Sequence, residues 1–309
     1  MRESLDSAAT AALLPFPALV AALRRAVDEL ARGVIACPAR QVQPLRAGGV
    51  LLSMIATAPD IAVHKLVSVV PDNPERGLPT IAGQLSVVDA ADGGIRLILD
   101  GATVTERRTG ALSMLGIETL LGHAPRRVLL VGTGVQALSH AKALAALYPA
   151  VAIDVAGRNA ASVERFCMEL DVLLPGAGGP RYAAADLSAV DEAVDVVITA
   201  TTSAQPVYSL PARAGRLLIA VGSFKPSAAE IGAETVRASR VFVDDLHGAR
   251  HEAGDLLQAG VDWERVQGLS AALTGPPLAA AEPVLLKTVG CAAWDLAAAR
   301  VALSMRGAG

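Results

Sequence analysis

The sequence predicts an α/β fold in which a doubly wound parallel sheet is inserted into a smaller α+β domain. Two observations carry this prediction. From residue 127 onward, short β-branched runs alternate with helical periodicities, which is typical of a parallel sheet covered by helices. Before residue 100, the β-rich runs instead follow one another without helices between them, as in an antiparallel sheet.

Composition and charge exclude several classes of protein. The 309 residues are 52% hydrophobic and only 3% aromatic, so Ala, Val, Leu and Gly must fill the core, and a disordered chain is excluded. The net charge of −3 gives no basic surface for a nucleic acid. Three widely spaced cysteines fit buried thiols in a reducing compartment. An apolar stretch at residues 7–23 is interrupted by prolines and follows acidic residues. We therefore expect a soluble cytoplasmic protein with neither a nucleic-acid partner nor a membrane partner.

The first third of the chain reads as two helices, a β-rich region and a third helix. Apolar residues recur at three and four positions through residues 4–30, and Gly33 ends this pattern. Strands are predicted at 50–55, 61–70, 85–88 and 95–99, and the loop containing Gly93 joins the last two into a hairpin. Helical spacing returns at 103–121.

The rest of the chain alternates strands and helices. Strands are predicted at 127–131, 151–156, 194–199, 216–221 and 241–243. Helices are predicted at 135–147 and 160–170, and a long helix at 286–305 closes the chain.

A glycine-rich turn follows the strand at 127–131 directly. It reads Gly132-Thr-Gly134-Val-Gln136-Ala137 and precedes a helix. The first glycine allows a tight turn, the second lets the backbone approach a pyrophosphate, and the small alanine lets helix and strand pack closely. This context predicts a Rossmann-type dinucleotide site with the phosphates at the helix N-terminus.

The end of the next strand indicates which dinucleotide is bound. An NAD-selective protein usually has an acidic residue there, whereas this chain has Ala156-Gly-Arg158-Asn159. A guanidinium matches the geometry of a 2′-phosphate, so Arg158 favours NADPH, with NADH also possible. The alternative is that Arg158 is solvated and Asp154 supplies the acid. The residues after two later strands, Thr201 and Thr202 after one and Val221-Gly-Ser223 after the other, are expected to line the nicotinamide crevice.

Two stretches outside the nucleotide-binding segment contain further candidates. Lys65 lies inside an apolar β run, where a cation is costly unless it faces a polar site, and burial lowers its pKa toward a range useful for proton transfer. The alternative is a lysine that extends to solvent from an edge strand. At 105–109, only one of the adjacent residues Arg107 and Arg108 can face inward, and Arg107 is expected at the surface.

The order of these motifs resembles the ornithine cyclodeaminase/mu-crystallin family. The matching motifs span nearly the whole chain, and together they are far more specific than the glycine turn alone. They are Pro38-x-Arg40, Lys65 followed by Asn73-x-x-x-Gly-Leu-Pro-Thr80, Thr105-x-x-Arg108-Thr109, Gly132 to Ala137, and Val289-Gly290-x-Ala-x-x-Asp295-Leu296.

The resemblance implies a role for each matching residue. Arg40 and Arg108 clamp the carboxylate of an amino or imino acid, and Lys65 binds the carboxylate or the reacting centre and assists proton transfer. Met54, Thr80, Val289 and Gly290 line the pocket, the last two from the start of the final helix. The implied nucleotide contacts are Gly134, Gln136, Ala137, Arg158, Asn159, and Thr201 or Thr202, besides Gly132 and Val221. The family is dimeric through its non-Rossmann domain, so a homodimer is expected.

One departure from the family pattern selects a branch. Ornithine cyclodeaminases have an Asp two residues after the glycine of a Gly-x-Asp-x-Pro turn, and here that position is Phe224. An apolar ring cannot exchange a proton, so the cyclodeaminase acid–base group is lacking. The Gly-x-Phe-x-Pro form resembles the branch that reduces the cyclic ketimines Δ1-pyrroline-2-carboxylate and its six-membered homologue to L-proline and L-pipecolate. The alternatives are ornithine cyclodeaminase, alanine dehydrogenase, and a non-catalytic NADPH-binding protein like mu-crystallin.

The motif positions also divide the chain. Residues 121–283 are expected to form the Rossmann domain, and residues 1–120 with 284–309 the substrate-binding and dimerisation domain. His247 and His251 have the spacing of a zinc pair on a helix, but a third ligand is not evident, so a solvated helix face is expected instead of a metal site.

Overall fold

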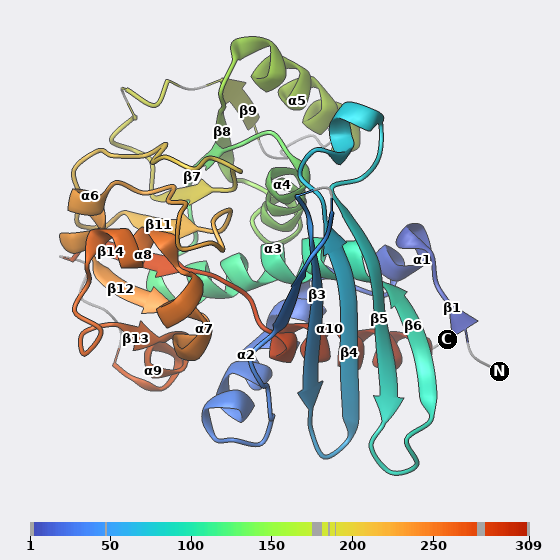
Figure 1. Cartoon of the computed structure of the whole chain (residues 1–309). Coiled ribbons are helices and arrows are strands. Elements are labelled where there is room, and N and C mark those ends of the chain that lie inside the picture. Colours follow the sequence, from blue (N-terminus) through green and yellow to red (C-terminus); the bar gives the residue numbers. More distant parts are fainter. Residues whose placement is uncertain are drawn as a thin grey trace. The chain divides into compact units, whose positions relative to one another are not determined.

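The computed structural model describes residues 3–46, 48–174, 181–184, 186–188, 190–276 and 282–307. The chain divides into two compact units, which we call the terminal unit (Met1–Arg108 with Cys291–Gly309) and the central unit (Thr109–Gly290). Each unit has its own sheet and is described by itself (Figure 1). Among the described helices, none combines the length and the hydropathy that crossing a membrane requires.

The sheet of the terminal unit has six strands in the order β1-β6-β5-β4-β3-β2. All neighbouring strands pair antiparallel except β1 with β6. The predicted hairpin is confirmed, because β5 pairs antiparallel with β6, and Gly93 has a φ of +71° in the loop that joins them. The strands are β1 (Glu3–Ser4), β2 (Gln41–Pro44), β3 (Val50–Thr57), β4 (Ile61–Val69), β5 (Ile81–Asp89) and β6 (Ile95–Asp100).

Helices cover one face of this sheet. Along β4, every second residue is buried, so one face of the strand packs inward and the other does not. Helix α10 packs on β3, β4 and α2, and it buries Trp294 completely. The helices of this unit are α1 (Ser7–Ala12), α2 (Phe16–Ala31), the 3-10 turn η1 (Asn73–Arg76), the first part of α3 (Gly101–Leu120), and α10 (Ala292–Gly307).

Arg107 corrects the expectation of a surface side chain. Its Nε donates a hydrogen bond of 2.7 Å to the Leu14 carbonyl, and its guanidinium carbon lies 4.2 Å from the centre of the Phe16 ring. The guanidinium group thus makes both a hydrogen bond and a cation–π contact, as is common for arginine at a half-buried position. Arg107 therefore ties α3 to the segment between α1 and α2.

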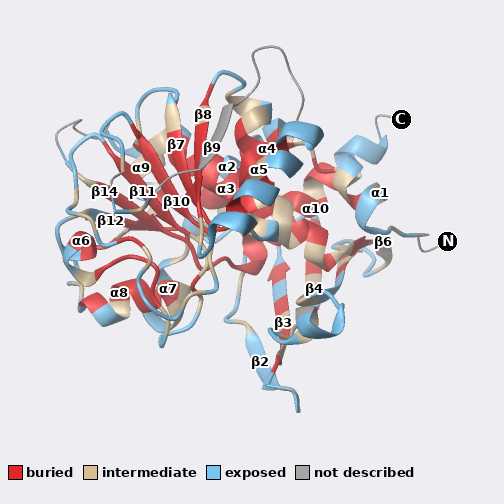
Figure 2. Cartoon of the chain, turned by 90° about the horizontal axis from the view of Figure 1, so that it is seen from above, coloured by how far each residue is buried: buried red, intermediate tan, exposed pale blue. Residues whose placement is uncertain are grey.

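The central unit contains the predicted parallel sheet, which confirms the α/β fold class. Its eight strands run in the order β13-β12-β14-β11-β10-β7-β8-β9, and all pairings are parallel. Figure 2 shows its central strands as largely buried. The strands are β7 (Arg127–Val131), β8 (Ala152–Ala156), β9 (Arg181–Ala184), β10 (Val196–Thr199), β11 (Leu217–Ala220), β12 (Arg240–Val243), β13 (Gln267–Gly268) and β14 (Val284–Lys287).

The strand order reverses at the pair β7 and β10. The chain passes from β7 outward to β8 and β9, then returns to the other side of β7 as β10 and β11. Ligands of open α/β sheets bind at such a reversal, beyond the carboxyl ends of the strands. The remaining helices are α4 (Val135–Leu147), α5 (Ala160–Leu173), α6 (Ala233–Arg237), α7 (Leu246–Glu252), α8 (Gly254–Ala259) and α9 (Leu269–Thr274).

The predicted final helix at 286–305 is wrong at its start. Residues Val284–Lys287 form strand β14 between β11 and β12, and α10 begins only at Ala292. A short, continuously apolar run is compatible with either a buried strand or a buried helix, and here it forms a strand of the parallel sheet. Val289 and Gly290 consequently lie in the connection before the helix, where Gly290 has a φ of +74°.

Candidate active site

The turn between β7 and α4 has the form that a dinucleotide site requires. Gly132 has a φ of +124°, and a Cβ there would lie 2.5 Å from the Ala200 carbonyl oxygen, so a side chain is excluded. A Cβ on Gly134 would meet no atom within 4 Å. Ala137 is fully buried against the strand layer. The geometry of these three positions is compatible with the roles predicted for them, and those roles stay predictions.

The N-terminus of α4 is a candidate anion site. Gly134 is its N-cap residue, and no side chain in the described part of the chain caps it through a hydrogen bond. The first backbone N–H groups of a helix and its dipole attract negative charge, and the open side of Gly134 leaves room for close approach. The turn therefore fits the pyrophosphate of a nicotinamide dinucleotide.

The end of β8 presents Arg158 rather than an acid. Arg158 is exposed after the strand, and the neighbouring Asn159 caps α5 by accepting a 2.8 Å hydrogen bond from the Ser162 N–H. Asp154 is buried within β8, where Arg127 Nε donates to its carboxylate over 2.7 Å. The carboxylate of Asp154 is thus held by an arginine, so the alternative that it binds the ribose is not favoured.

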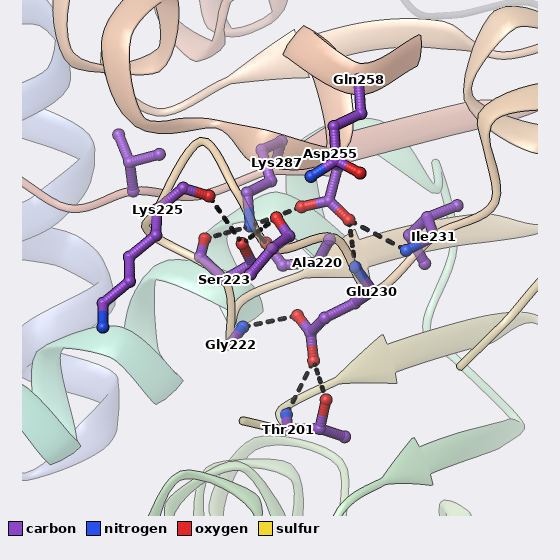
Figure 3. A network of polar contacts seen from close by, with 12 residues as sticks. Thr201, Ala220, Gly222, Ser223, Lys225, Glu230, Ile231, Asp255, Gln258 and Lys287 are labelled. Atoms are coloured by element: carbon purple, nitrogen blue, oxygen red, sulfur yellow. Dashed lines mark hydrogen bonds and ion pairs between the residues drawn. The ribbon is translucent and has the colours of Figure 1, made fainter. Parts of the chain in front are cut away.

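Two further loops leave the sheet beside the glycine turn. Thr201 and Thr202 follow β10, and Val221 follows β11. Glu230, which is absent from the predicted site residues, accepts hydrogen bonds from both loops (Figure 3). Of the two threonines, Thr201 is the one that Glu230 holds, and Thr202 is exposed.

In the terminal unit, the structure brings Lys65 and Arg108 together around a buried carboxylate. Lys65 Nζ lies 2.7 Å from Asp295 Oδ2, and Arg108 Nε lies 3.5 Å from Asp295 Oδ1. Lys65 also donates a 3.3 Å hydrogen bond to Thr105 Oγ1 on α3. Lys65 and Asp295 are essentially fully buried, and Arg108 is only 7% exposed. Lys65 therefore does not extend to solvent.

The strand pattern explains why Lys65 faces inward. On β4 it shares the buried face with Val63 and Val67, whereas His64 points to the other face and contacts Ser53 Oγ at 3.0 Å. Burial lowers the pKa of Lys65 to about 8, and the charges of Arg108 and Arg40 lower it too, while Asp295 opposes them. The pKa of the Lys65 amine is therefore much closer to neutral pH than that of an exposed lysine.

The other predicted residues of this unit differ in their closeness to Lys65. Arg40 is close enough to act on the charge of Lys65. Met54 is buried and is the direct partner of Lys65 in the pairing of β3 with β4. Thr80 directly precedes β5 and lies beyond the end of β4, where its carbonyl accepts a 2.8 Å hydrogen bond from the Val70 N–H.

The predicted pocket residues of the central unit follow strands β11 and β14. Phe224 is half-buried after β11, and Lys225 Nζ lies 6.0 Å from the centre of its ring. Asp244 accepts hydrogen bonds of 2.9 Å and 2.8 Å from the N–H groups of Val289 and Gly290. A buried carboxylate thus fixes the turn that contains both residues.

Asp295, Asp244 and Glu230 are the residues that the sequence reasoning missed. Asp295 belongs to the terminal motif that begins at Val289, but the motif does not indicate which side chain the carboxylate contacts. A signal existed, because Asp295 is an acid within an Ala-rich and otherwise apolar stretch, and buried acids are rare unless paired. Asp244 follows the predicted strand at 241–243, and Glu230 lies in the irregular segment between the strands predicted at 216–221 and 241–243. Nothing in the sequence around these two acids indicates that they are buried.

The two spaced histidines form a helix face. His247 and His251 are exposed on α7 with ring centres 5.4 Å apart. Within the described residues, no group of three or more His, Cys, Asp or Glu side chains is arranged to hold a metal ion.

Comparison with known proteins identifies close relatives. The ornithine cyclodeaminase/mu-crystallin family matches residues 6–304. A protein of Burkholderia ambifaria named Delta(1)-pyrroline-2-carboxylate reductase 2 is 54% identical over 299 residues, which cover 97% of this chain and 94% of that protein. The Delta(1)-pyrroline-2-carboxylate/Delta(1)-piperideine-2-carboxylate reductase of Azospirillum brasilense is 53% identical over 98% of this chain and 97% of its own length.

Solved structures share the fold. The Delta(1)-pyrroline-2-carboxylate reductase of Thermococcus litoralis, in complex with NADH and L-proline, matches with a TM-score of 0.89 at 24% identity, covering 100% of this chain and 98% of that one. An archaeal alanine dehydrogenase dimer with bound NAD matches with a TM-score of 0.87 at 22% identity, covering 100% and 96%. The family match and the two close relatives extend over almost the whole sequence. The chain therefore belongs to the ornithine cyclodeaminase/mu-crystallin family.

Proposed function

We propose that the protein is an NAD(P)H-dependent reductase of cyclic ketimines, which converts Δ1-pyrroline-2-carboxylate to L-proline and Δ1-piperideine-2-carboxylate to L-pipecolate. The observation that carries this proposal is the buried Lys65–Asp295 pair with Arg108 beside it. The names of the relatives from Burkholderia and Azospirillum, each more than half identical to this chain, support the same reaction and both ring sizes.

The charges around Lys65 suit a substrate with one carboxylate. Lys65 lies near two further cations, Arg108 and Arg40, and the Asp295 carboxylate pairs with Lys65 and Arg108. A bound carboxylate anion brings the local charge closer to neutrality, and arginine offers it paired N–H donors. Arg40 and Arg108 are therefore the proposed carboxylate clamp, and buried Met54 is an apolar neighbour of the lysine. Thr80, Phe224, Val289 and Gly290 complete the proposed set of substrate-binding residues.

Lys65 is the proposed proton donor to the imine. Its pKa of about 8 leaves the amine mostly protonated at neutral pH, yet close enough to transfer its proton. Asp295 keeps the Lys65 ammonium charged and fixes its position, since the carboxylate lies 2.7 Å from Nζ. Lys65 Nζ is also held by Thr105, which leaves few orientations for the amine.

The proposed cofactor is NADPH, and NADH is the alternative. The bound nicotinamide supplies the hydride that reduces C2 of the imine. The α4 N-terminus and the glycine turn hold the pyrophosphate, while Arg158 pairs with the 2′-phosphate at the end of β8. Gln136, Asn159, Thr201, Thr202 and Val221 are the further proposed contacts.

The reaction is tested by supplying purified protein with Δ1-pyrroline-2-carboxylate and NADPH. We expect loss of absorbance at 340 nm and formation of L-proline, and no ammonia from L-ornithine, because Phe224 replaces the acid that cyclodeamination needs. Ammonia release from L-ornithine without ketimine reduction contradicts the proposal. Reduction of pyruvate with ammonia in preference to the ketimine indicates an alanine dehydrogenase instead.

We also propose that the exposed face of the β3–β4 pair forms a homodimer interface. Ile55 and Leu66 are 44% and 36% exposed on the face opposite to Lys65. Exposed apolar side chains that gather on one sheet face usually mark an interface. The double substitution Ile55→Glu with Leu66→Glu should convert a dimer to a monomer in light scattering, whereas a wild-type monomer contradicts this assembly.

A further inference from the structure

A buried network of charges connects the two loops that follow β10 and β11 (Figure 3). Lys287, on β14, is completely buried. Its Nζ donates to the Ser223 carbonyl over 2.6 Å and to the Ala220 carbonyl over 3.3 Å, and it lies 3.0 Å from Asp255 Oδ2. The lysine therefore holds the start of the loop that contains Phe224.

Asp255 connects this lysine to a second carboxylate. Asp255 Oδ1 accepts hydrogen bonds of 2.6 Å and 2.9 Å from the N–H groups of Glu230 and Ile231. These bonds fix the backbone of Glu230, whose side chain is itself completely buried. Lys287, Asp255 and Glu230 thus form one continuous chain of contacts.

The Glu230 carboxylate joins the two loops directly. Its Oε1 accepts from the Thr201 N–H at 2.7 Å and from Thr201 Oγ1 at 2.8 Å, while its Oε2 accepts from the Gly222 N–H at 2.6 Å. The loops approach so closely that a Cβ on Gly222 would lie 2.0 Å from the Thr201 carbonyl oxygen. Three donors from the two loops thus bind one desolvated carboxylate, which restrains the position of each loop relative to the other.

We propose that Glu230 is a positioning residue for the nicotinamide end of the dinucleotide. This inference rests on the proposed function. In an open α/β sheet, the pyrophosphate binds at the first βα turn, which here lies between β7 and α4, and the nicotinamide extends along the strands on the other side of the reversal. Thr201 and Gly222 belong to that second side, and Glu230 sets their spacing through the bonds above.

The chain contains a matched carboxylate at the opposite edge of the same sheet. Asp195 precedes β10, and its Oδ2 accepts from the N–H groups of Arg126 and Arg127 at 2.7 Å and 3.3 Å. It therefore joins the amino ends of β7 and β10, as Glu230 joins the loops after the carboxyl ends of β10 and β11. Asp195→Asn is therefore the matched control. It removes a carboxylate that also accepts backbone hydrogen bonds but lies away from the proposed dinucleotide site.

The experiment compares Glu230→Gln with Asp195→Asn. A glutamine amide nitrogen cannot accept the Gly222 or Thr201 N–H, so one loop loses its partner. For Glu230→Gln, we expect kcat/KM to fall about tenfold to a hundredfold, the size expected for a hydrogen bond to a charged group. Binding of 2′-phospho-ADP-ribose, which lacks nicotinamide, should stay within about twofold of wild type. Asp195→Asn should lower the melting temperature without changing either quantity.

Two results overturn the inference. One is an unchanged kcat/KM in Glu230→Gln; the other is an equal loss of affinity for NADPH and for 2′-phospho-ADP-ribose, which indicates general damage to the domain. If Glu230→Gln does not fold, Glu230→Asp replaces it, because the shorter carboxylate keeps the charge but cannot reach both loops. The same two criteria then apply to it.

The nucleotide measurements separate this inference from the proposed function. Affinity for NADPH and for its fragment is measured without any imino acid, and NADH with ADP-ribose replaces them if NADH binds better. A wild-type protein that binds nucleotide but does not reduce the ketimine contradicts the proposed function alone. In that case, selective loss of NADPH affinity in the Glu230 variant supports the positioning role, and unchanged NADPH affinity overturns it.

Discussion

Lys65 Nζ and Asp295 Oδ2 lie 2.7 Å apart, and both side chains are shielded from solvent in the terminal unit. The lysine comes from β4 and the aspartate from α10, so the pair forms only when both ends of the chain have folded together. Removing one member of such a pair leaves an uncompensated buried charge. The pair therefore controls the charge of the amine that we propose as the proton donor.

Asp295→Asn should shift the pH profile of the enzyme. The lowered pKa of about 8 for Lys65 predicts that kcat/KM declines above roughly pH 8, as the amine loses its proton. Without the Asp295 charge, burial and the two arginines lower the pKa of Lys65 further, so the decline should begin about one pH unit lower or more. The profile of kcat/KM from pH 6 to 10 measures this shift.

Asp60→Asn is the matched control for that profile. Asp60 is also an acid of the terminal unit paired with an arginine, since Arg300 Nε donates to it over 2.8 Å, but it is exposed. We expect Asp60→Asn to leave the pH at which kcat/KM begins to decline unchanged. If kcat/KM declines at the same pH in Asp295→Asn as in wild type, titration of Lys65 is not the cause of the decline.

Arg158→Ala should change the choice of cofactor. The exposed guanidinium after β8 can pair with a 2′-phosphate, which only NADPH has. We expect the dissociation constant for NADPH to rise about tenfold to a hundredfold while that for NADH stays nearly constant. Fluorescence titration of both nucleotides measures the ratio, and equal effects on the two rule out recognition of the phosphate by Arg158.

Phe224→Asp should impair the reductase. If Phe224 contacts the substrate as we propose, an acid at this position repels the substrate carboxylate and replaces an apolar contact with a hydrated group. We expect kcat/KM for Δ1-pyrroline-2-carboxylate to fall by at least about tenfold, and Phe224→Leu to retain most of it. Steady-state kinetics of both variants provide the measurement. Wild-type kcat/KM in Phe224→Asp means that this residue does not contact the substrate.

His140 should make the folded state sensitive to acid. Its Nδ1 lies 2.6 Å from the Gln136 carbonyl oxygen and its Nε2 lies 2.8 Å from Ser113 Oγ, and burial lowers its pKa to about 4. Because the unfolded chain binds this proton near pH 6.5, the stabilisation is complete above that pH and is lost as the pH falls toward 4. The loss amounts to about 3 kcal/mol.

His140→Asn tests this linkage, since the amide can donate to the same carbonyl but does not titrate. Urea unfolding at pH 7, 5.5 and 4.5 should show a smaller decline in the free energy of unfolding for the variant than for wild type. His123→Asn, at an exposed histidine, should decline as wild type does. Parallel declines in all three proteins assign the acid sensitivity to other groups.

Much of the fold follows from sequence periodicity. The strands β3 to β6 and the units β7, α4, β8 and α5 lie within a few residues of their predicted positions, because each combines a clear apolar pattern with turn residues at its ends. Leu286 and Lys287, at the end of the buried strand β14, were predicted as the start of the final helix, since a continuous apolar run does not reveal its period. Short strands such as β13 have too few residues to show a pattern.

The site was less predictable than the fold, because its partners are distant in sequence. A buried lysine on β4 implies a carboxylate nearby, yet only the packing of α10 on β3 and β4 identifies Asp295 as that carboxylate. Glu230 likewise follows an irregular segment, and its role depends on two loops that meet only in the folded sheet. Sequence patterns indicate which residues are unusual, while tertiary contacts decide what they touch.

The central claim is that this chain transfers hydride to C2 of a cyclic ketimine. Its most direct test is a reaction of Δ1-pyrroline-2-carboxylate with NADPH deuterated at C4 on the transferred side, with the product examined by mass spectrometry and NMR. We predict L-proline carrying one deuterium at C2. Proline without that deuterium, or no proline while L-ornithine releases ammonia, contradicts the account.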